Sequence, residues 1–315
     1  MNRNETGPGQ TLPRTGGSIP GSEDKPAFTL RRRRPLPMPV LLAVPHAGRG
    51  YTDDLLGRLR QPDEASLRLE DRYVDLVGEA VARETGAALL VAHAPRAMID
   101  LNRSPSDVDW DMIAGGTVSA VRSRLSAGRR ARSGLGLVPR RLPGLGELWN
   151  RRLSHAELEE RIAQVHRPYH AAIADTLEGM RDRWGAALLI DLHSMPPLGP
   201  KAGPGRAVDY VVGDRFGGSC GSALVTTALD HFDRGGLHAA HNRPYAGGYV
   251  LDRHGSPARG VHAMQLEICR ATYLDRAMRE PGRGLADVVA TVASLVRRLA
   301  GELSSGSEEW RDAAE

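Results

Sequence analysis

The chain has 315 residues, of which 41% are hydrophobic and 25% are charged, so it is long enough for one large or two ordinary globular domains. No apolar run approaches the roughly 18 residues that a membrane-spanning helix needs, and no membrane partner is expected. The N-terminus carries no apolar segment typical of a secretory signal, and the chain has only two cysteines. We therefore expect a cytoplasmic protein without a disulfide framework.

Arginine dominates the positive charge, because Lys25 and Lys201 are the only lysines among 42 basic residues. Between residues 115 and 152 there are nine arginines and a single acidic residue, Glu147. Such a segment is either a solvated insertion or a surface for a polyanion. It lacks interleaved aromatic residues and nucleic-acid motifs, so no specific nucleic-acid partner is expected. A non-catalytic polyanion-binding protein remains an alternative function.

The predicted elements begin after a leader. Residues 1–35 are rich in Gly, Pro, Ser and Thr and end in four arginines, a composition that predicts disorder. We expect the folded domain over residues 36–303 and a disordered tail over 304–315. The domain opens with a buried strand at 39–44. An amphipathic helix, which begins near Tyr73, follows it, and a second buried strand comes next at 87–93.

The middle of the chain is an Arg/Gly-rich excursion with short helical pieces, over residues 104–150. A capping box at Ser154 and Glu157 then starts a long helix, in which Pro168 predicts a kink. Further elements are strands at 186–190, 208–214 and 261–268 and helices at 219–234 and 285–299. Because strands alternate with helices, the pattern predicts an α/β sandwich with parallel strand pairing.

Histidines follow two of the predicted strands. Ligands of open α/β sheets bind at the carboxyl ends of the strands, and His46 and His193 lie at such ends. Two histidines, one carboxylate and an open position form the donor set of a catalytic zinc site. Glu70, Asp71 and Asp75 are the candidate carboxylates. The pattern therefore predicts a metal site.

Two further carboxylates lie in apolar strand segments. Asp191 is two residues before His193, so it either orients that imidazole or forms a salt bridge or turn cap. Glu267 lies among apolar strand residues, where an unpaired carboxylate is costly. It is therefore either a general base or the ion-pair partner of an arginine such as Arg270.

An ordered set of motifs across the chain resembles the N-formylglutamate amidohydrolase family. The matching segments are VPHAG (44–48), RAMIDLNR (96–103), RPYH (167–170), IDLHSMP (190–196), DYVVGDRFG (209–217), NRPYAGGYVLDRHG (242–255) and GVHAMQLEICRATYLD (260–275). The resemblance implies a three-layer α/β/α sandwich with a mixed, mostly parallel sheet, similar to zinc carboxypeptidases and aspartoacylases.

The resemblance also implies an activity: zinc-dependent hydrolysis of N-formyl-L-glutamate to formate and L-glutamate, a late step of histidine degradation. One zinc ion per chain would bind His46, Asp71 and His193. Glu267 matches the expected general base, and Arg96 would polarise the scissile carbonyl.

The same resemblance assigns the substrate contacts to Asn102, Arg103, Arg243 and Tyr245. The acidic motif departs from the family pattern at Leu69–Asp75, where Glu70 lies beside Asp71 and leaves the third metal ligand open. The expected partner is a small acidic N-acyl amino acid. The alternative enzyme function is hydrolysis of a different N-acyl amino acid or small amide.

Overall fold

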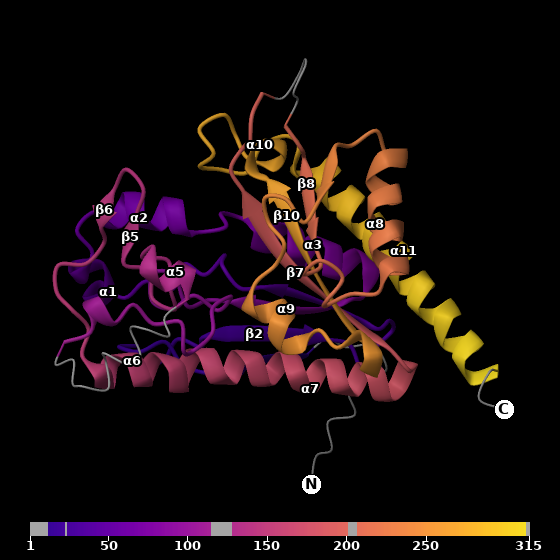
Figure 1. The fold of residues 1–315 in the computed structure, drawn as a ribbon, viewed down its shortest axis with the longest axis horizontal. Coiled ribbons are helices and arrows are strands. Elements are labelled where there is room, and N and C mark those ends of the chain that lie inside the picture. Colours follow the sequence, from indigo (N-terminus) through magenta and orange to yellow (C-terminus); the bar gives the residue numbers. More distant parts are fainter. Residues whose placement is uncertain (1–11, 23, 115–127, 201–206, 313–315) are drawn as a thin grey trace, which may run out of the picture.

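The computed structural model describes residues 12–22, 24–114, 128–200 and 207–312, and an eight-stranded sheet lies at its centre (Figure 1). The strand order in the sheet is β1-β2-β4-β3-β7-β10-β8-β9. The strand bounds are β1 Leu12–Gly16, β2 Phe28–Arg32, β3 Val40–Val44, β4 Ala88–Ala92, β7 Ala187–Met195, β8 Tyr210–Gly213, β9 Ala239–His241 and β10 Val261–Cys269.

The sheet is parallel at its centre and mixed at its edges. Strands β4, β3, β7 and β10 are mutually parallel, whereas β2 and β8 join this group in antiparallel orientation. The central strands are apolar runs because helices cover both faces of the sheet. The predicted mixed, mostly parallel sheet is confirmed.

Helices cover the sheet in two layers (Figure 1). Helices α3 (Val74–Thr85), α8 (Ser222–Arg234) and α11 (Leu285–Asp312) share one apolar core with one face of the sheet. Helices α7 (Arg167–Trp184) and α9 (Tyr249–His254) pack on the opposite face. The predicted α/β/α sandwich is confirmed. None of the helices in the described part of the chain is long and apolar enough to cross a membrane.

Short elements join the main helices and strands. Helices α1 (Asp53–Arg58) and α2 (Pro62–Leu69) precede α3, and α10 (Arg270–Tyr273) directly follows β10. The excursion at 104–150 contains a 3-10 turn at Trp110–Met112, helix α5 (Arg129–Arg132) and a hairpin of β5 (Arg141–Leu142) and β6 (Gly146–Glu147). Residues 115–127 of the arginine-rich segment lie outside the described residues.

The long helix is interrupted before Pro168 rather than at it. The predicted capping box is present at the start of α6 (His155–Arg161), where Ser154 and Glu157 bond each other's backbone N–H groups. A π-helical turn at Ile162–His166 then leads into α7. Pro168 follows this turn in α7 and has no N–H for a helical hydrogen bond, and the Gln164 carbonyl instead accepts the backbone N–H of Ser18 at 3.1 Å. The helix is therefore irregular in the π-turn just before Pro168, rather than kinked at the proline itself.

The N-terminal segment corrects the predicted leader. Strand β2 pairs with β4 and β1 pairs with β2, so the described part of residues 12–35 belongs to the sheet. Phe28 and Leu30 are buried and the ring of Phe28 meets Tyr169 at 5.8 Å, whereas Arg31 on the other face pairs with Glu79. Residues 1–11 lie outside the described residues. The predicted tail is wrong as well, since α11 continues to Asp312.

Candidate metal centre and active site

Three predicted metal ligands meet at the carboxyl end of the central strands. His46 lies just beyond β3, His193 lies near the carboxyl end of β7, and Asp71 lies between α2 and α3. The backbone N–H of Asp71 donates to the His46 carbonyl at 2.9 Å and ties the two segments together. All three side chains are buried. The sequence separates these residues widely, but the fold brings them to one point.

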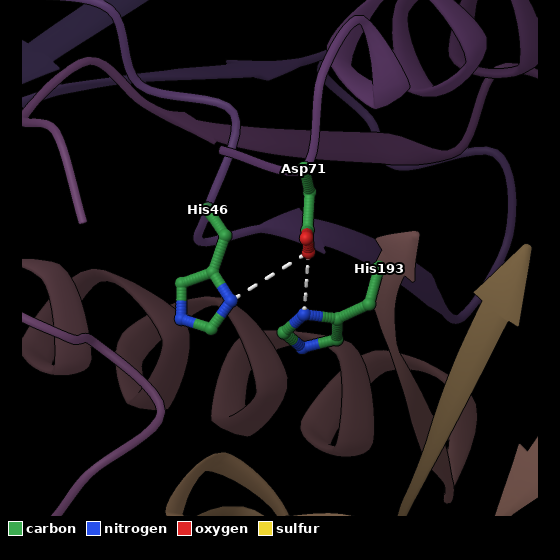
Figure 2. A group of neighbouring side chains, drawn as sticks. All are labelled: His46, Asp71 and His193. Atoms are coloured by element: carbon green, nitrogen blue, oxygen red, sulfur yellow. Dashed lines mark hydrogen bonds and ion pairs between the residues drawn. The ribbon is translucent and has the colours of Figure 1, made fainter. Parts of the chain in front are cut away.

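The carboxylate of Asp71 lies between the two imidazole rings (Figure 2). Its Oδ2 atom is 2.9 Å from Nδ1 of His193 and 3.6 Å from Nδ1 of His46. One ligand atom from each residue lies within 4.8 Å of the other two. The Nδ1 atoms of both rings therefore face the same carboxylate.

The donor set fits a zinc ion. The Nδ1 atom of His46 is buried and has no hydrogen-bond partner, which is costly for a polar atom unless a metal or another group binds it. Two imidazole nitrogens and a carboxylate oxygen are the protein ligands of known catalytic zinc sites. The residues at this point thus suit a zinc ion and leave further coordination positions to water or substrate.

Outer carboxylates hold the far side of each ring. His46 donates from Nε2 to Asp100 Oδ1 at 2.7 Å, and His193 donates from Nε2 to Asp191 Oδ2 at 2.8 Å. A proton on Nε2 leaves Nδ1 with a free lone pair, and such carboxylate partners orient metal-binding histidines. Asp191 therefore takes the orienting position, one of its two predicted alternatives. Sequence reasoning missed Asp100, although it stands in the strand-end motif between Arg96 and Asn102.

The pKa values of Asp71 and His193 depend on each other. Burial favours the neutral form of Asp71, but the hydrogen bond to His193 and the nearby ring of His46 hold the pKa of its carboxyl group well below the usual value. Burial disfavours the charged form of His193, but Asp191 and Asp71 raise its pKa well above the usual value. Without a metal ion, the two carboxylates therefore favour a second proton on the His193 ring, at Nδ1. A metal ion would take the place of that positive charge.

The other two candidate carboxylates turn away from the histidines. Glu70 pairs with Arg72, with 3.1 Å between Oε2 and Nη1, and Asp75 accepts a hydrogen bond from Arg49 at 3.2 Å. Each of these carboxylates already forms an ion pair with an arginine. The geometry favours Asp71 as the third ligand.

Glu267 lies beside the metal ligands on the neighbouring strand. It is the register partner of His193 in the parallel β10–β7 pair, so both side chains project from the same face. Gln265 donates to Glu267 Oε1 at 2.8 Å, and burial raises the pKa of Glu267 to about 7. Arg270 does not pair with it. Instead, its guanidinium bonds Ser194 at 3.0 Å and lies 3.4 Å from Asp71. A buried carboxylate with this pKa suits a general base.

Arg96 reaches the site through Asp100. Its Nε donates to Asp100 Oδ2 at 2.9 Å, while the other oxygen of the same carboxylate holds His46. Burial disfavours the charged guanidinium, but Asp100 and Asp71 raise its pKa above the usual value. Arg96 is therefore a fixed cation next to the proposed metal position.

A cavity of about 460 Å³ opens above these residues. Of the four predicted substrate contacts, Asn102, Arg103 and Tyr245 line it. Arg243 is exposed and is not among the described residues that line the cavity, so the structure does not bring it to the site. The cavity is also lined by residues that sequence reasoning did not place there, namely Leu67, Arg68, Arg130, Leu135, Leu142, Pro196 and Gln265.

Asn102 uses its amide to hold the cavity wall. Its Oδ1 accepts the backbone N–H of Val250 at 2.9 Å, and its Nδ2 donates to Gln265 at 3.3 Å. A Cβ atom at Gly248 would lie 2.6 Å from Asn102 Oδ1, so only glycine leaves room for this contact. Asn102 thus connects the loop before α9 to β10, a different role from the predicted contact with substrate.

Arg103 is a half-buried cation that no carboxylate of the described residues neutralises. Its Nε donates to the Leu135 carbonyl at 3.0 Å and its Nη1 to the Asn102 carbonyl at 2.7 Å. Burial lowers its pKa relative to a free guanidinium. These two bonds fix its orientation and leave donors for an anion in the cavity.

Three histidines, from the π-turn, α7 and α9, support the backbone of residues 101–103. His166 and His170 donate from Nε2 to the carbonyls of Arg103 and Leu101, at 2.9 and 3.0 Å. His170 and His254 share a 2.9 Å hydrogen bond, and burial lowers the pKa of each below the usual value. These neutral rings fix the backbone on both sides of Asn102.

Comparison with known proteins agrees with this geometry. The model of the N-formylglutamate amidohydrolase family matches residues 38–274. The chain belongs to this family. The resemblance inferred from the motifs is thereby confirmed.

Relatives named as N-formylglutamate deformylases match most of the chain. N-formylglutamate deformylase of Pseudomonas aeruginosa is 30% identical over 274 residues, which are 86% of this chain and 95% of the relative. The Pseudomonas putida deformylase is 28% identical and covers 87% of this chain and 96% of its own length. The crystal structure of N-formylglutamate amidohydrolase from Ralstonia eutropha JMP134 is 32% identical, covers 89% of this chain and 99% of that one, and superposes with a TM-score of 0.79.

Proposed function

We propose that this protein hydrolyses N-formyl-L-glutamate to formate and L-glutamate, with one zinc ion held by His46, Asp71 and His193. The observation that carries the proposal is the buried His46–Asp71–His193 group with Glu267 beside it, at the floor of a cavity lined by arginines. Membership of the amidohydrolase family and the names of the relatives support the substrate.

Zinc, when bound, polarises a carbonyl oxygen and lowers the pKa of a nearby water to roughly 7. Glu267 accepts the proton of the attacking water, because its own pKa near 7 makes it a usable base at neutral pH. The same carboxyl group then gives that proton to the departing amine nitrogen of glutamate. One residue thereby serves both proton transfers.

Arg96 stabilises the negative charge that develops on the formyl oxygen. Its guanidinium is oriented in advance by Asp100, so it does not need to reorganise during the reaction. Such preorganised donors commonly contribute about 3–4 kcal/mol to the barrier reduction. We assign Arg96 this role because it lines the cavity and lies next to the metal ligands through Asp100.

The substrate is a dianion, and the cavity is built for negative charge. Arg103 holds the carboxylate next to the scissile amide, with its guanidinium fixed by two backbone carbonyls. Tyr245 forms part of the same wall, and Asn102 holds the nearby backbone at Val250. We withdraw Arg243 from the substrate contacts, because it is exposed outside the cavity.

We place the reaction in the cytoplasm as a step of histidine degradation. Cys220 and Cys269 are both buried and free, which suits a reducing compartment. The family assignment supports the pathway, since hydrolysis of N-formylglutamate releases the glutamate carbon skeleton.

A panel of N-acyl amino acids tests the substrate. The purified protein is assayed for release of the acyl group from N-formyl-L-glutamate, N-acetyl-L-glutamate, N-formyl-L-alanine and N-formyl-D-glutamate. The proposal expects the highest kcat/KM with N-formyl-L-glutamate. A higher kcat/KM with N-acetyl-L-glutamate or N-formyl-L-alanine would instead support the alternative, a hydrolase of a different N-acyl amino acid.

A further inference from the structure

The arginines that line the cavity fall into two groups. Arg96 pairs with Asp100, and Arg270 lies 3.4 Å from a carboxylate oxygen of Asp71. By contrast, Arg68, Arg103 and Arg130 line the cavity without an ion pair to any carboxylate of the described residues. The second group is therefore available to an anion from solution.

The unpaired arginines lie at different depths. The metal ligands and Glu267 are buried at the floor, Arg103 is half-buried above them, and Arg68 and Arg130 are exposed. A ligand whose reacting end sits at the floor therefore meets Arg103 first. The exposed pair lies further out, towards the mouth.

Two structural elements present this outer pair. Arg68 belongs to the last turn of α2, and its Nη2 donates to the Pro143 carbonyl at 2.7 Å, in the turn between β5 and β6. Arg130 belongs to α5 in the same excursion of the chain. Aliphatic side chains complete this outer wall, namely Leu67, Leu135 and Leu142.

The positive charges are close enough to act on each other. Burial lowers the pKa of Arg103, and repulsion from Arg96 and Arg130 lowers it further. The charge of Arg130 also acts on the pKa of Tyr245, which lines the same cavity. A second carboxylate in this part of the cavity would relieve the repulsion among these cations.

We propose that Arg68 and Arg130 form an outer subsite that binds the side-chain carboxylate of the substrate, while Arg103 binds its α-carboxylate. In glutamate the side-chain carboxylate lies two carbon atoms further from the amide nitrogen than the α-carboxylate does. With the formyl group at the floor, the nearer carboxylate reaches Arg103 and the further one reaches the mouth. This inference rests on the proposed function and names the groups that select an acidic side chain.

The test compares N-formyl-L-glutamate with N-formyl-L-glutamine, whose side chain has nearly the same shape but no charge. The values of kcat/KM for both substrates are measured for the wild type and for Arg68→Gln and Arg130→Gln. Because hydrogen bonds to charged groups are lost, the glutamate-to-glutamine ratio falls about tenfold or more in each variant. The value for N-formyl-L-glutamine changes little. Arg141→Gln is the matched control, since Arg141 is an exposed arginine of the β5–β6 hairpin and does not line the cavity.

Lysine variants separate a fork contact from long-range attraction. Arg68→Lys and Arg130→Lys keep the charge but lose the planar bidentate geometry, so the ratio falls in these variants too. If both lysine variants keep the wild-type ratio, the arginines act by general attraction and the subsite is wrong. Thermal unfolding and zinc content confirm that each variant is folded, which the exposure of both side chains favours.

The remaining outcomes distinguish the subsite from the activity. A wild type that cleaves both N-formyl amino acids with equal kcat/KM, or glutamine variants with an unchanged ratio, contradicts the outer subsite and leaves the hydrolase activity intact. A zinc-loaded wild type that releases formate from neither compound contradicts the proposed function, and the subsite with it.

Discussion

His46 donates a hydrogen bond from Nε2 to Asp100 Oδ1 across 2.7 Å, and both side chains are buried. The other oxygen of Asp100 accepts from Arg96 at 2.9 Å. One carboxylate thus sets the orientation of a proposed metal ligand and of the cation proposed to stabilise the oxyanion. This shared partner makes metal affinity and turnover depend on the same residue.

Replacing Asp100 by asparagine tests this dependence. An asparagine oxygen accepts a hydrogen bond from His46 or from Arg96, but its NH₂ group cannot accept the other. We expect zinc affinity to fall about 10–100-fold, as happens when such outer partners are lost. Competition with a zinc chelator measures the change. Asp175→Asn, at an exposed position on α7, is the control and should leave the affinity unaltered. An unchanged affinity in Asp100→Asn would show that the orienting contact is unimportant.

Replacing Glu267 by glutamine tests the general base. The amide keeps the shape and the contact with Gln265 but cannot accept a proton, so kcat should fall by about 10²–10⁴-fold. Zinc content, measured by metal analysis, should stay at the wild-type value, because Glu267 is not one of the three grouped ligands. If kcat stays at the wild-type level with zinc bound, another group is the base.

The pH dependence of kcat/KM follows from the same residue. Burial raises the pKa of Glu267 to about 7, so the carboxyl group is protonated and inactive below that pH. We therefore expect kcat/KM to rise with pH through this range and to lose about tenfold for each unit below it. An initial-rate profile from pH 5 to 9 measures the effect. A profile that is flat between pH 5 and 8 would exclude a base with a raised pKa.

Two arginine variants test whether Arg103, and not Arg243, contacts the substrate. Arg103→Gln removes a cation from the cavity wall, and KM for N-formyl-L-glutamate should rise about tenfold or more. Arg243→Gln removes an exposed cation outside the cavity lining and should change KM less than twofold on the scale of surface substitutions. Steady-state kinetics of both variants measure this. The reverse ranking would restore Arg243 to the substrate contacts.

Gly248 is predicted to be intolerant of any side chain. A Cβ atom there would lie 2.6 Å from Asn102 Oδ1 and displace the amide that holds Val250. Gly248→Ala should therefore lower the free energy of unfolding by about 1–3 kcal/mol. Chemical denaturation measures the change. Gly57→Ala is the matched control, since a Cβ atom at Gly57 on α1 meets nothing within 4 Å and should not destabilise the protein.

The apolar runs predicted most of the central sheet. Strands β3, β4 and β10 match the predicted segments because parallel strands covered on both faces leave long apolar runs in the sequence. Strand β7 was predicted only as far as residue 190, where the apolar run ends, but it continues to Met195. Strands β1 and β2 escaped because Gly, Pro and Arg dominate the composition around them. The alternation of Phe28 and Leu30 with Thr29 and Arg31 was the available signal, since only alternate residues of β2 face the core.

The site was only partly readable from the sequence. His46 and His193 could be predicted because each comes at the carboxyl end of an apolar strand segment, at the rim of the sheet. Asp100 could not, because its role depends on which side-chain atoms meet across 54 residues of sequence. Arg243 and Tyr245 were both assigned through the same family motif, but the turn exposes the first and brings only the second to the cavity.

Titration of the metal-free protein with zinc, followed by formate release from N-formyl-L-glutamate, tests the central claim most directly. The His46–Asp71–His193 site predicts that activity rises in proportion to bound zinc and levels off at one zinc ion per chain. Alanine in place of His193 should abolish both the binding and the activity. Full formate release by protein that metal analysis shows to be metal-free would contradict the account.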